Sequence, residues 1–471
     1  MQNKTAYVWG LLSRFAPQGI YLVTTMILAR FLSPDDFGVI GVLSIIFVVA
    51  NVLLDAGLGG SLIKEKNITN IDCSSVSVFN MLVSIFIYVA LFMCSNTLER
   101  YFGIEGLSTV ICTISLVFPF SAFAIVPKAI LNRDLRFQAA FMNSLIGVIA
   151  GSVSSIIIAL IGGGIYALVT YQVVTVAVTG IANYISSRYR FSFRFSLESL
   201  KRFLPFGVLT TIISVIDTIY ENLITTLTGK YLNVQQAGYL YQAKRIEETM
   251  TSSLATTINV VSFPILTRLK DDREKFIIEA DSTFKTIICL TLPLLFLAAS
   301  FAEEIIILLF GCQWIDSAPY FELLIFAGVF IVMESLIRNF VKSLCEVNKL
   351  LYITLSKRIL CILLLFTALY VSSELMIYMY MFTSFIGYLA NLVLYNKLIN
   401  RNTFSSLLIV VVYALPSVCY FVMMKLPFVL SLGLYEKIGM SLILQLFIYL
   451  LVLRFYGIQI AEWIKKSIRK S

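Results

Sequence analysis

The chain contains no histidine among its 471 residues, and only 13% of the residues are charged. Without histidine, the protein has neither a histidine proton relay nor the commonest metal-binding side chain. The sequence also lacks a GxxxxGK[ST] loop, which ATP-hydrolysing P-loop proteins use to hold phosphates. The eight cysteines stand singly and show no metal-binding or disulfide spacing. These absences argue against a nucleotide-driven pump, a metal site and a disulfide-stabilised domain.

Apolar residues, by contrast, make up 59% of the chain, and the mean hydropathy is +0.89. Soluble domains carry about 45–50% apolar and about 25% charged residues. Apolar runs of about 20 residues recur from end to end, and each can cross a hydrocarbon core of about 30 Å. These runs are too long and too unalternating for the strands of a barrel. We therefore predict an all-α integral membrane protein with about fourteen transmembrane helices.

The first apolar segment is expected to remain in the protein as a membrane helix. It carries Arg14 in its middle, runs too long for a signal peptide and lacks a small-residue cleavage pattern. The loops between the apolar segments are too short to form a soluble domain. The chain is therefore predicted to lie almost wholly within and beside the bilayer.

The basic residues predict the orientation of the chain. With the loops numbered in order, 27 of the 36 Lys and Arg residues fall at the termini or in even-numbered loops. The odd-numbered loops hold Arg30, Arg100, Lys230, Lys244, Arg245, Lys425 and Lys437. Basic loops stay in the cytoplasm, so both termini and the even loops are predicted to be cytoplasmic. Attraction to anionic lipid then explains the net charge of +9 without a nucleic-acid partner.

Two related stretches lie 200 residues apart. ILARFLSPDDFGVIGV (27–42) and LTGKYLNVQQAGYLYQ (227–242) each end one apolar segment and begin the next. The corresponding residues, predicted to form a structural corner, are Arg30 and Gly38 in the first stretch and Lys230 and Gly238 in the second. Asp35 or Asp36 is expected to pair with Arg30 or to cap the helix that follows.

Six spans separate the two corners, so the two halves of the chain are predicted to share one orientation. Such a parallel repeat is related by an axis along the membrane normal. The predicted plan has an N-terminal six-helix lobe over residues 1–190 and a second six-helix lobe over 191–400. Two additional transmembrane helices and a basic cytoplasmic tail occupy 401–471.

Polar side chains follow one helical face in the first and seventh apolar segments. The first stripe comprises Tyr7, Arg14, Gln18, Tyr21 and Thr25, and the second comprises Ser214, Asp217, Thr218, Glu221, Thr225 and Thr228. Charged groups at membrane depth cost about 2.5–3.5 kcal/mol even on the lenient insertion scale, so they usually face a bundle interior or a wet cavity. We predict that both stripes line a cavity. Hydrogen bonds between neighbouring helices are the alternative, which would suffice for the Ser and Thr residues.

Three other charged residues are secondary candidates. Glu334 and Arg338 stand four residues apart in the tenth segment, where they can pair with each other. Asp55, in LLDAGLGG, lies near the cytoplasmic end of the second segment. Its neighbouring glycines favour a backbone-capping or packing role.

Four stretches in order resemble the Wzx-type polysaccharide flippases, which belong to the multidrug/oligosaccharidyl-lipid/polysaccharide exporter superfamily. The first is ILARFLSPDDFGVIGV, and LLDAGLGGSLIK (53–64) and PKAILNRDLRFQ (127–138) follow it. In the fourth, LTGKYLNVQQAGYLYQAKRI (227–246), the match rests on Gly238, Tyr239, Tyr241 and Ala243. The resemblance extends over nearly the whole chain.

This resemblance implies two pseudo-symmetric lobes around a central cavity that opens alternately to each side of the bacterial cytoplasmic (inner) membrane. The implied cargo is an undecaprenyl-diphosphate-linked oligosaccharide, moved to the outer leaflet for O-antigen, capsule or exopolysaccharide synthesis. Membrane lipids, a polysaccharide polymerase and chain-length machinery are the other implied partners. The resemblance implies a transporter and not an enzyme.

The resemblance also suggests roles for the two polar stripes. Arg14 matches the basic cavity residues that meet the anionic carrier in this family. The other substrate-binding candidates are Gln18, Tyr21, Thr25, Ser214 and Thr218. Asp217 and Glu221 depart from the pattern, because carboxylates repel a diphosphate. They are expected either to bind a coupling proton or sodium ion or to hydrogen-bond sugar hydroxyls.

Two other functions are compatible with the sequence. A cation-coupled drug or small-molecule exporter of the same superfamily would confer drug resistance. A membrane-embedded sugar-transferring enzyme would need catalytic acids in a substantial outer loop, and the odd-numbered loops are mostly short.

Overall fold

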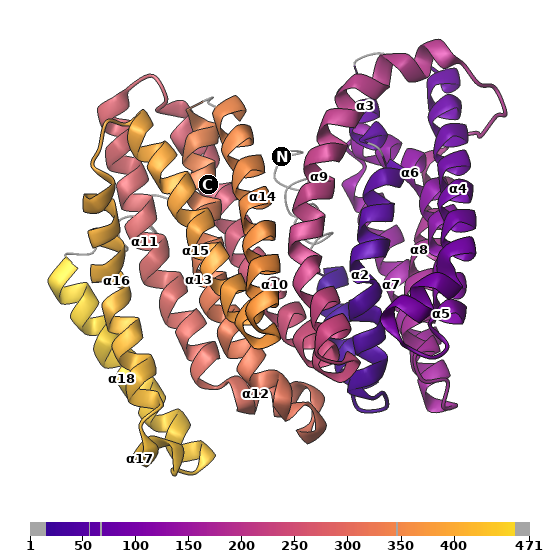
Figure 1. Cartoon of the computed structure of the whole chain (residues 1–471). Coiled ribbons are helices and arrows are strands. Elements are labelled where there is room, and N and C mark those ends of the chain that lie inside the picture. Colours follow the sequence, from indigo (N-terminus) through magenta and orange to yellow (C-terminus); the bar gives the residue numbers. More distant parts are fainter. Residues whose placement is uncertain (1–15, 56, 66–67, 345–346, 457–471) are drawn as a thin grey trace. The chain divides into compact units, whose positions relative to one another are not determined.

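The computed structural model describes residues 16–55, 57–65, 68–344 and 347–456, and within these ranges it contains helices, turns and loops but no strand (Figure 1). The helix Ala16–Leu28 comes first. The helices that follow are α2 (Pro34–Asp55), α3 (Leu58–Lys64), α4 (Asn70–Phe102), α5 (Leu107–Ile114), α6 (Val117–Arg133), α7 (Phe137–Leu160), α8 (Tyr166–Ser187), α9 (Leu197–Tyr231), α10 (Val234–Arg268), α11 (Arg273–Ser300), α12 (Ala302–Phe310), the 3-10 helix η1 (Cys312–Ser317), α13 (Ala318–Ser343), α14 (Val347–Val371), α15 (Ser373–Leu398), α16 (Thr403–Met424), α17 (Pro427–Leu430) and α18 (Leu434–Tyr456).

Ten helical stretches in the described ranges are long and apolar enough to cross a membrane. The all-α membrane fold is therefore confirmed. The shorter helix Ala16–Leu28 and the long helices α9, α10 and α18 lie where the other four spans are predicted. The count of fourteen spans stays a prediction.

The chain divides into two compact units. The first contains the residues up to Gln242 together with Leu309–Trp314, and the second contains Ala243–Leu308 and the residues from Ile315 onward. Helix α10 therefore begins in the first unit and ends in the second. The predicted boundaries at residues 190 and 400 come from the sequence repeat, whereas these two units are defined by contacts within the fold. The predicted boundaries therefore stay predictions.

Small residues let α7 and α8 approach closely in the first unit. Gly147 and Gly151 lie one turn apart on α7, and a Cβ on either would overlap a threonine hydroxyl oxygen of α8. The hydroxyls belong to Thr179 and Thr175 respectively. Such small-xxx-small contacts hold membrane helices together, because lipid gives no hydrophobic driving force for helix association. The crossing fixes the position of α8 against α7.

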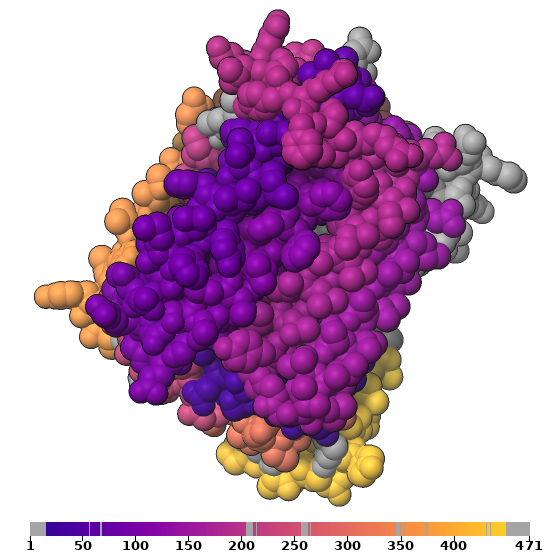
Figure 2. Space-filling model, turned by 90° about the vertical axis from the view of Figure 1, so that its right-hand side faces the viewer, coloured from indigo at the N-terminus to yellow at the C-terminus, as the bar shows by residue number. Residues whose placement is uncertain are grey.

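The outer sides of α4 and α7 carry apolar side chains. Leu82, Phe86 and Met93 of α4 are 60%, 73% and 75% exposed, at helical spacing along one face. Figure 2 shows this side of the molecule, where the helices of the first unit form most of the surface. Bilayer lipid is the natural environment for such a face, since the hydrocarbon core is as apolar as these side chains.

An apolar cluster fills the predicted cytoplasmic end of the first unit. It joins α3, α4, α6 and the start of α9 through Leu62, Val76, Val126 and Phe203. Tyr189 completes the cluster, and burial raises the pKa of its phenol. Its hydroxyl shares a hydrogen bond of 3.1 Å with Ser77. The cluster anchors the connection between α8 and α9 to the helices before it.

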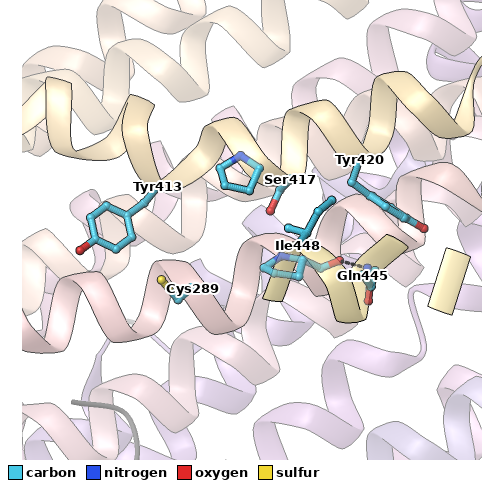
Figure 3. A pocket seen from close by; sticks show the side chains of 8 residues that line it. Cys289, Tyr413, Ser417, Tyr420, Gln445 and Ile448 are labelled. Carbon is cyan, nitrogen blue, oxygen red and sulfur yellow. Dashed lines mark hydrogen bonds between the residues drawn. The ribbon is translucent and has the colours of Figure 1, made fainter. Parts of the chain in front are cut away.

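In the second unit, α16 and α18 pack beside α11. The Tyr420 hydroxyl of α16 lies 2.7 Å from the Ser441 hydroxyl of α18. Gln445 Nε2 of α18 donates to the Pro293 carbonyl of α11 at 3.0 Å (Figure 3). A gap of about 20 Å³ lies among them, next to Pro416. A water needs roughly 10–15 Å³. The gap is therefore a packing defect beside two helix-interior prolines and too small for a ligand.

Candidate functional site: a polar chamber in the first unit

The first unit contains a chamber of about 560 Å³ lined by α2, α3, α6, α7 and α8. This volume lies within the usual range of small-molecule sites. The polar side chains that line the chamber are Asn51, Asp55, Ser121, Lys128, Asn132, Ser144, Thr175, Thr179 and Asn183. In the predicted orientation, the chamber lies in the cytoplasmic half of the unit.

The break between α2 and α3 positions the chamber's carboxylate. Gly57 precedes α3 with a φ of 65°, a left-handed conformation that costs glycine little. Asp55, at the end of α2, accepts a hydrogen bond from the Gly59 amide at 3.2 Å through Oδ1. Asp55 therefore caps the start of α3, as one of its predicted roles requires, and it also lines the chamber. Its second oxygen has no hydrogen-bond or salt-bridge partner among the described residues.

The Lys128 ammonium and all three asparagine side chains of the chamber keep polar atoms without a hydrogen-bond partner among the described residues. Lys128 and Asn132 lie one turn apart on α6, and neither side chain bonds to the described part of the chain. Asn51 donates to the Phe47 carbonyl at 3.0 Å, which leaves its side-chain oxygen as an acceptor. Asn183 accepts from Asn143 Nδ2 at 3.0 Å, which leaves its own amino group as a donor. The chamber therefore presents both donors and acceptors.

The first-segment stripe is only partly described. Arg14 lies outside the described residues. Gln18 is exposed, and the Tyr21 ring lies 4.9 Å from the ring of Tyr171 on α8. Thr25 is buried and donates to the Tyr21 carbonyl one turn back at 2.8 Å. The Thr25 hydroxyl therefore bonds within its own helix, and neither Gln18 nor Tyr21 lines the chamber.

The seventh-segment stripe runs along α9 from exposed to buried surroundings. Ser214 and Glu221 are exposed, Asp217 is half-buried and Thr218 is buried. Farther along, Thr225 packs against Gly41 of α2. A Cβ on Gly41 would lie 2.9 Å from the Thr225 methyl group. None of these side chains lines the chamber. The two stripes and the chamber are therefore separate features among the described residues.

The two corners that repeat at an offset of 200 residues pack against each other. A Cβ on Gly38 would overlap the Val234 carbonyl oxygen, and a Cβ on Gly238 would overlap the Pro34 carbonyl oxygen. Val234, which Gly38 contacts, is the equivalent at the 200-residue offset of Pro34, which Gly238 contacts. Such reciprocal contact is the mark of a local two-fold relation. At each place, only a residue without a Cβ allows the close backbone approach.

Ser33 and Asp36 form a capping box at the first corner. Asp36 Oδ2 accepts from the Ser33 amide at 2.9 Å, and the Asp36 amide donates to the Ser33 hydroxyl at 3.3 Å. These two bonds satisfy backbone donors that α2 leaves open at its start. Asp36 therefore caps the helix, one of the two roles predicted for it. Arg30 is exposed, and Lys230 lies over the Tyr101 ring, 4.3 Å from its centroid.

A segment from the second half of the sequence packs onto the first corner. Trp314 is fully buried and donates from Nε1 to the Ala29 carbonyl at 2.9 Å. Its ring makes an edge contact with Phe37 at 5.2 Å between centroids. These contacts explain why Leu309–Trp314, which begins in the last turn of α12, packs with the first unit. No pattern in the sequence predicts this contact.

The second unit holds a buried ion pair that the sequence indicated only in part. Glu334 of α13 accepts hydrogen bonds from Lys357 Nζ of α14 and, at 3.2 Å, from Asn391 Nδ2 of α15. Arg338, the partner that the spacing suggests, lies farther away, with Nη1 3.9 Å from the carboxylate. Glu334 and Lys357 are only 8% and 5% exposed. A Cβ on Gly387 would lie 2.6 Å from Glu334 Oε2, so glycine makes room for the carboxylate.

Most polar residues of the chamber were not among the predicted site residues. Asp55 alone was a candidate. Single Ser, Thr and Asn residues in apolar helices usually bond within the helix or between helices, so neither their identity nor their spacing distinguishes them. Lys128 and Lys357 fall near the ends of apolar runs, where the sequence places them in cytoplasmic loops. The chamber forms only where α2, α6, α7 and α8 pack together in the folded protein, so the sequence alone does not predict it.

Comparison with known proteins places the chain in a family. A family model described as "Polysaccharide biosynthesis protein" matches residues 27–319, which is more than half of the chain. The lipopolysaccharide biosynthesis protein WzxC of Escherichia coli (strain K12) is 26% identical over 328 residues, 68% of this chain and 66% of that protein. The succinoglycan biosynthesis transport protein ExoT of Rhizobium meliloti (strain 1021) is 27% identical over 319 residues, 67% of this chain and 64% of ExoT. The matches span about two thirds of these relatives.

Solved structures show the same fold at low sequence identity. The lipid II flippase MurJ in an inward closed conformation superposes with a TM-score of 0.75 at 14% identity, over 96% of this chain and 99% of MurJ. A multidrug resistance MATE family transporter of the MOP superfamily, in an inward-facing conformation, gives 0.63 at 14% identity, over 84% of this chain and 98% of its own. The chain therefore belongs to the polysaccharide biosynthesis protein family, and its resemblance to the Wzx-type polysaccharide flippases is confirmed.

Proposed function

We propose that the protein moves undecaprenyl-diphosphate-linked oligosaccharides from the cytoplasmic to the outer leaflet of the bacterial cytoplasmic membrane. The observation that carries this proposal is the polar chamber inside a bundle of apolar helices in a chain of this family. A sugar hydroxyl that enters hydrocarbon without a hydrogen-bond partner costs roughly 2–7 kcal/mol. Polar side chains along the path replace the lost water, and the polyprenyl tail stays in lipid.

Alternating access is the proposed mechanism, with both termini in the cytoplasm. In this proposal, Arg14 meets the diphosphate, and Gln18, Tyr21, Thr25, Ser214 and Thr218 also contact the cargo. Asp217 and Glu221 take up the proton or sodium ion that drives the cycle, since the sequence has no nucleotide-binding loop. The delivered units feed O-antigen, capsule or exopolysaccharide synthesis through a polymerase and its chain-length machinery. The protein itself makes and breaks no covalent bond.

Complementation tests this proposal. The wild-type gene should restore surface polysaccharide in its own species after deletion of the chromosomal copy. Arg14→Ala should abolish this restoration without lowering the amount of protein in the membrane, because the diphosphate loses its cation. Normal polysaccharide with Arg14→Ala would refute the role of Arg14. Drug resistance on expression, with no accumulation of lipid-linked sugar on deletion, would refute the flippase assignment.

A further inference from the structure

We infer that the chamber in the first unit binds the sugars of the cargo and not its diphosphate. The inference rests on the proposed function, which supplies the cargo. It goes further, because it assigns one part of that cargo to one set of side chains. Three features of the chamber support it: the state of its hydroxyls, its balance of charge and the rigidity of one wall.

The chamber's hydroxyls lack the bonds that hydroxyls elsewhere in the same helix make. On α7, Ser152 donates to the Val148 carbonyl at 2.7 Å, and Ser154 donates to the Ala150 carbonyl at 2.8 Å. Ser144 lies on the same helix but lines the chamber, and it makes no hydrogen bond with the described residues. Intrahelical back-bonding is the usual state of serine in a membrane helix. Ser144 is therefore available to a ligand.

The same is true of the facing helices. Ser121 on α6 and Thr179 on α8 line the chamber and make no hydrogen bond to the described part of the chain. Thr175 Oγ1 is buried and has no partner there either. A buried hydroxyl without a partner costs about 1–3 kcal/mol, so such groups in a native protein call for a ligand or a bound water. The part-buried hydroxyls of Ser121, Ser144 and Thr179 line the same chamber, which fits a molecule that itself carries many hydroxyls.

The charge of the lining favours the sugars over the diphosphate. Among the described residues, the chamber is lined by one carboxylate, Asp55, one ammonium, Lys128, and no arginine. Arginine is the usual bidentate partner of phosphate oxygens, and a carboxylate in the same chamber repels them. A neutral sugar, by contrast, needs acceptors and donors together. Asp55 and Asn51 supply acceptors, and Asn183 supplies donors.

One wall of the chamber is held rigidly. Thr175 and Thr179 project from α8 at the crossing where Gly147 and Gly151 allow α7 to approach. A fixed crossing holds the Thr179 hydroxyl in place before a ligand arrives, and such preorganisation lowers the entropy cost of binding. In the predicted orientation the chamber lies on the cytoplasmic side, where the sugars are assembled in the proposed function.

Binding to purified full-length protein in nanodiscs tests the inference. The two probes are the oligosaccharide released by mild acid from the producing strain's lipid-linked pool, and undecaprenyl diphosphate without sugar. Asn132→Ala combined with Ser144→Ala should weaken binding of the free oligosaccharide about tenfold or more, since two hydrogen bonds are lost. Binding of undecaprenyl diphosphate should stay within twofold. The matched control is Ser154→Ala, which removes a back-bonded hydroxyl from the same helix and should change neither affinity.

Two results would overturn the inference. One is a wild-type protein that binds undecaprenyl diphosphate but not the free oligosaccharide. The other is a double variant that melts at the wild-type temperature and binds the oligosaccharide as tightly as Ser154→Ala does. A separate flipping assay keeps the proposed function distinct: if wild-type protein flips the lipid-linked cargo while either result holds, the function stands and the assignment of the chamber fails.

Discussion

The substitution Gly238→Ala is expected to destabilise the protein by about 3 kcal/mol or more. The added Cβ would overlap the Pro34 carbonyl oxygen and lie 2.8 Å from the carbonyl carbon and 3.1 Å from the Gly38 nitrogen. All three are backbone atoms of a helix start, so no flexible side chain can move aside. Overpacking a well-packed place usually costs about 1–3 kcal/mol, and a backbone clash belongs at the upper end or beyond. The measurement is the thermal melting temperature of detergent-solubilised protein.

The reciprocal packing of the corners gives this prediction two controls. Gly38→Ala should cost about as much as Gly238→Ala, because its Cβ would overlap the Val234 carbonyl. The double variant should lose less stability than the two single variants added together, since both clashes separate the same pair of helices. Gly439→Ala, where a Cβ would meet nothing within 4 Å, should leave the melting temperature unchanged or raise it. Equal melting of Gly238→Ala and Gly439→Ala would show that the corners do not pack in this way.

The substitution Lys357→Met is expected to lower the free energy of unfolding by about 3–5 kcal/mol. Lys357 and Glu334 are both buried, and removal of the ammonium leaves a carboxylate in the bundle interior. Arg338 lies 3.9 Å away and Asn391 donates a single hydrogen bond, which compensate for only part of the lost charge. The double variant Glu334→Gln with Lys357→Met should recover most of the stability. It removes both charges and leaves an amide that Asn391 can still reach.

An exposed ion pair provides the matched control for Lys357. Lys425 at the end of α16 pairs with Glu322 of α13, and Lys425 is exposed. Pairs of this kind contribute about 0–1 kcal/mol, so Lys425→Met should shift the melting temperature little. The prediction fails if Lys357→Met and Lys425→Met have equal effects. It fails as well if the Glu334→Gln change worsens the Lys357→Met variant.

The sequence predicts helices well here because a span needs only length and apolar composition. It also identifies the corners, since the glycines, the basic residue and the offset recur together. The packing of Gly38 on Val234 explains that recurrence: each corner supplies the surface on which the other lies. The partner of Trp314 was not predictable, because no periodic pattern links residue 314 to Ala29.

The candidate site was harder to predict, for a physical reason. A charged residue in an apolar run stands out, so Glu334 and Asp55 were identified from the sequence. A serine that is open to a chamber and a serine that bonds to its own helix have the same sequence signal, as Ser144 and Ser154 illustrate on α7. Only the positions of neighbouring helices distinguish them. Arg14, the residue matched to the carrier, lies outside the described residues, and its role stays a prediction.

Movement of a lipid-linked oligosaccharide across a bilayer by the purified protein tests the central claim most directly. Proteoliposomes would carry the producing strain's lipid-linked cargo in both leaflets, and a membrane-impermeant glycosidase or lectin would be added outside. With the wild-type protein, nearly all of the cargo should become accessible, whereas protein-free liposomes should stop at about half. Folded, correctly inserted protein that also stops at half would contradict the account, whatever the chamber binds.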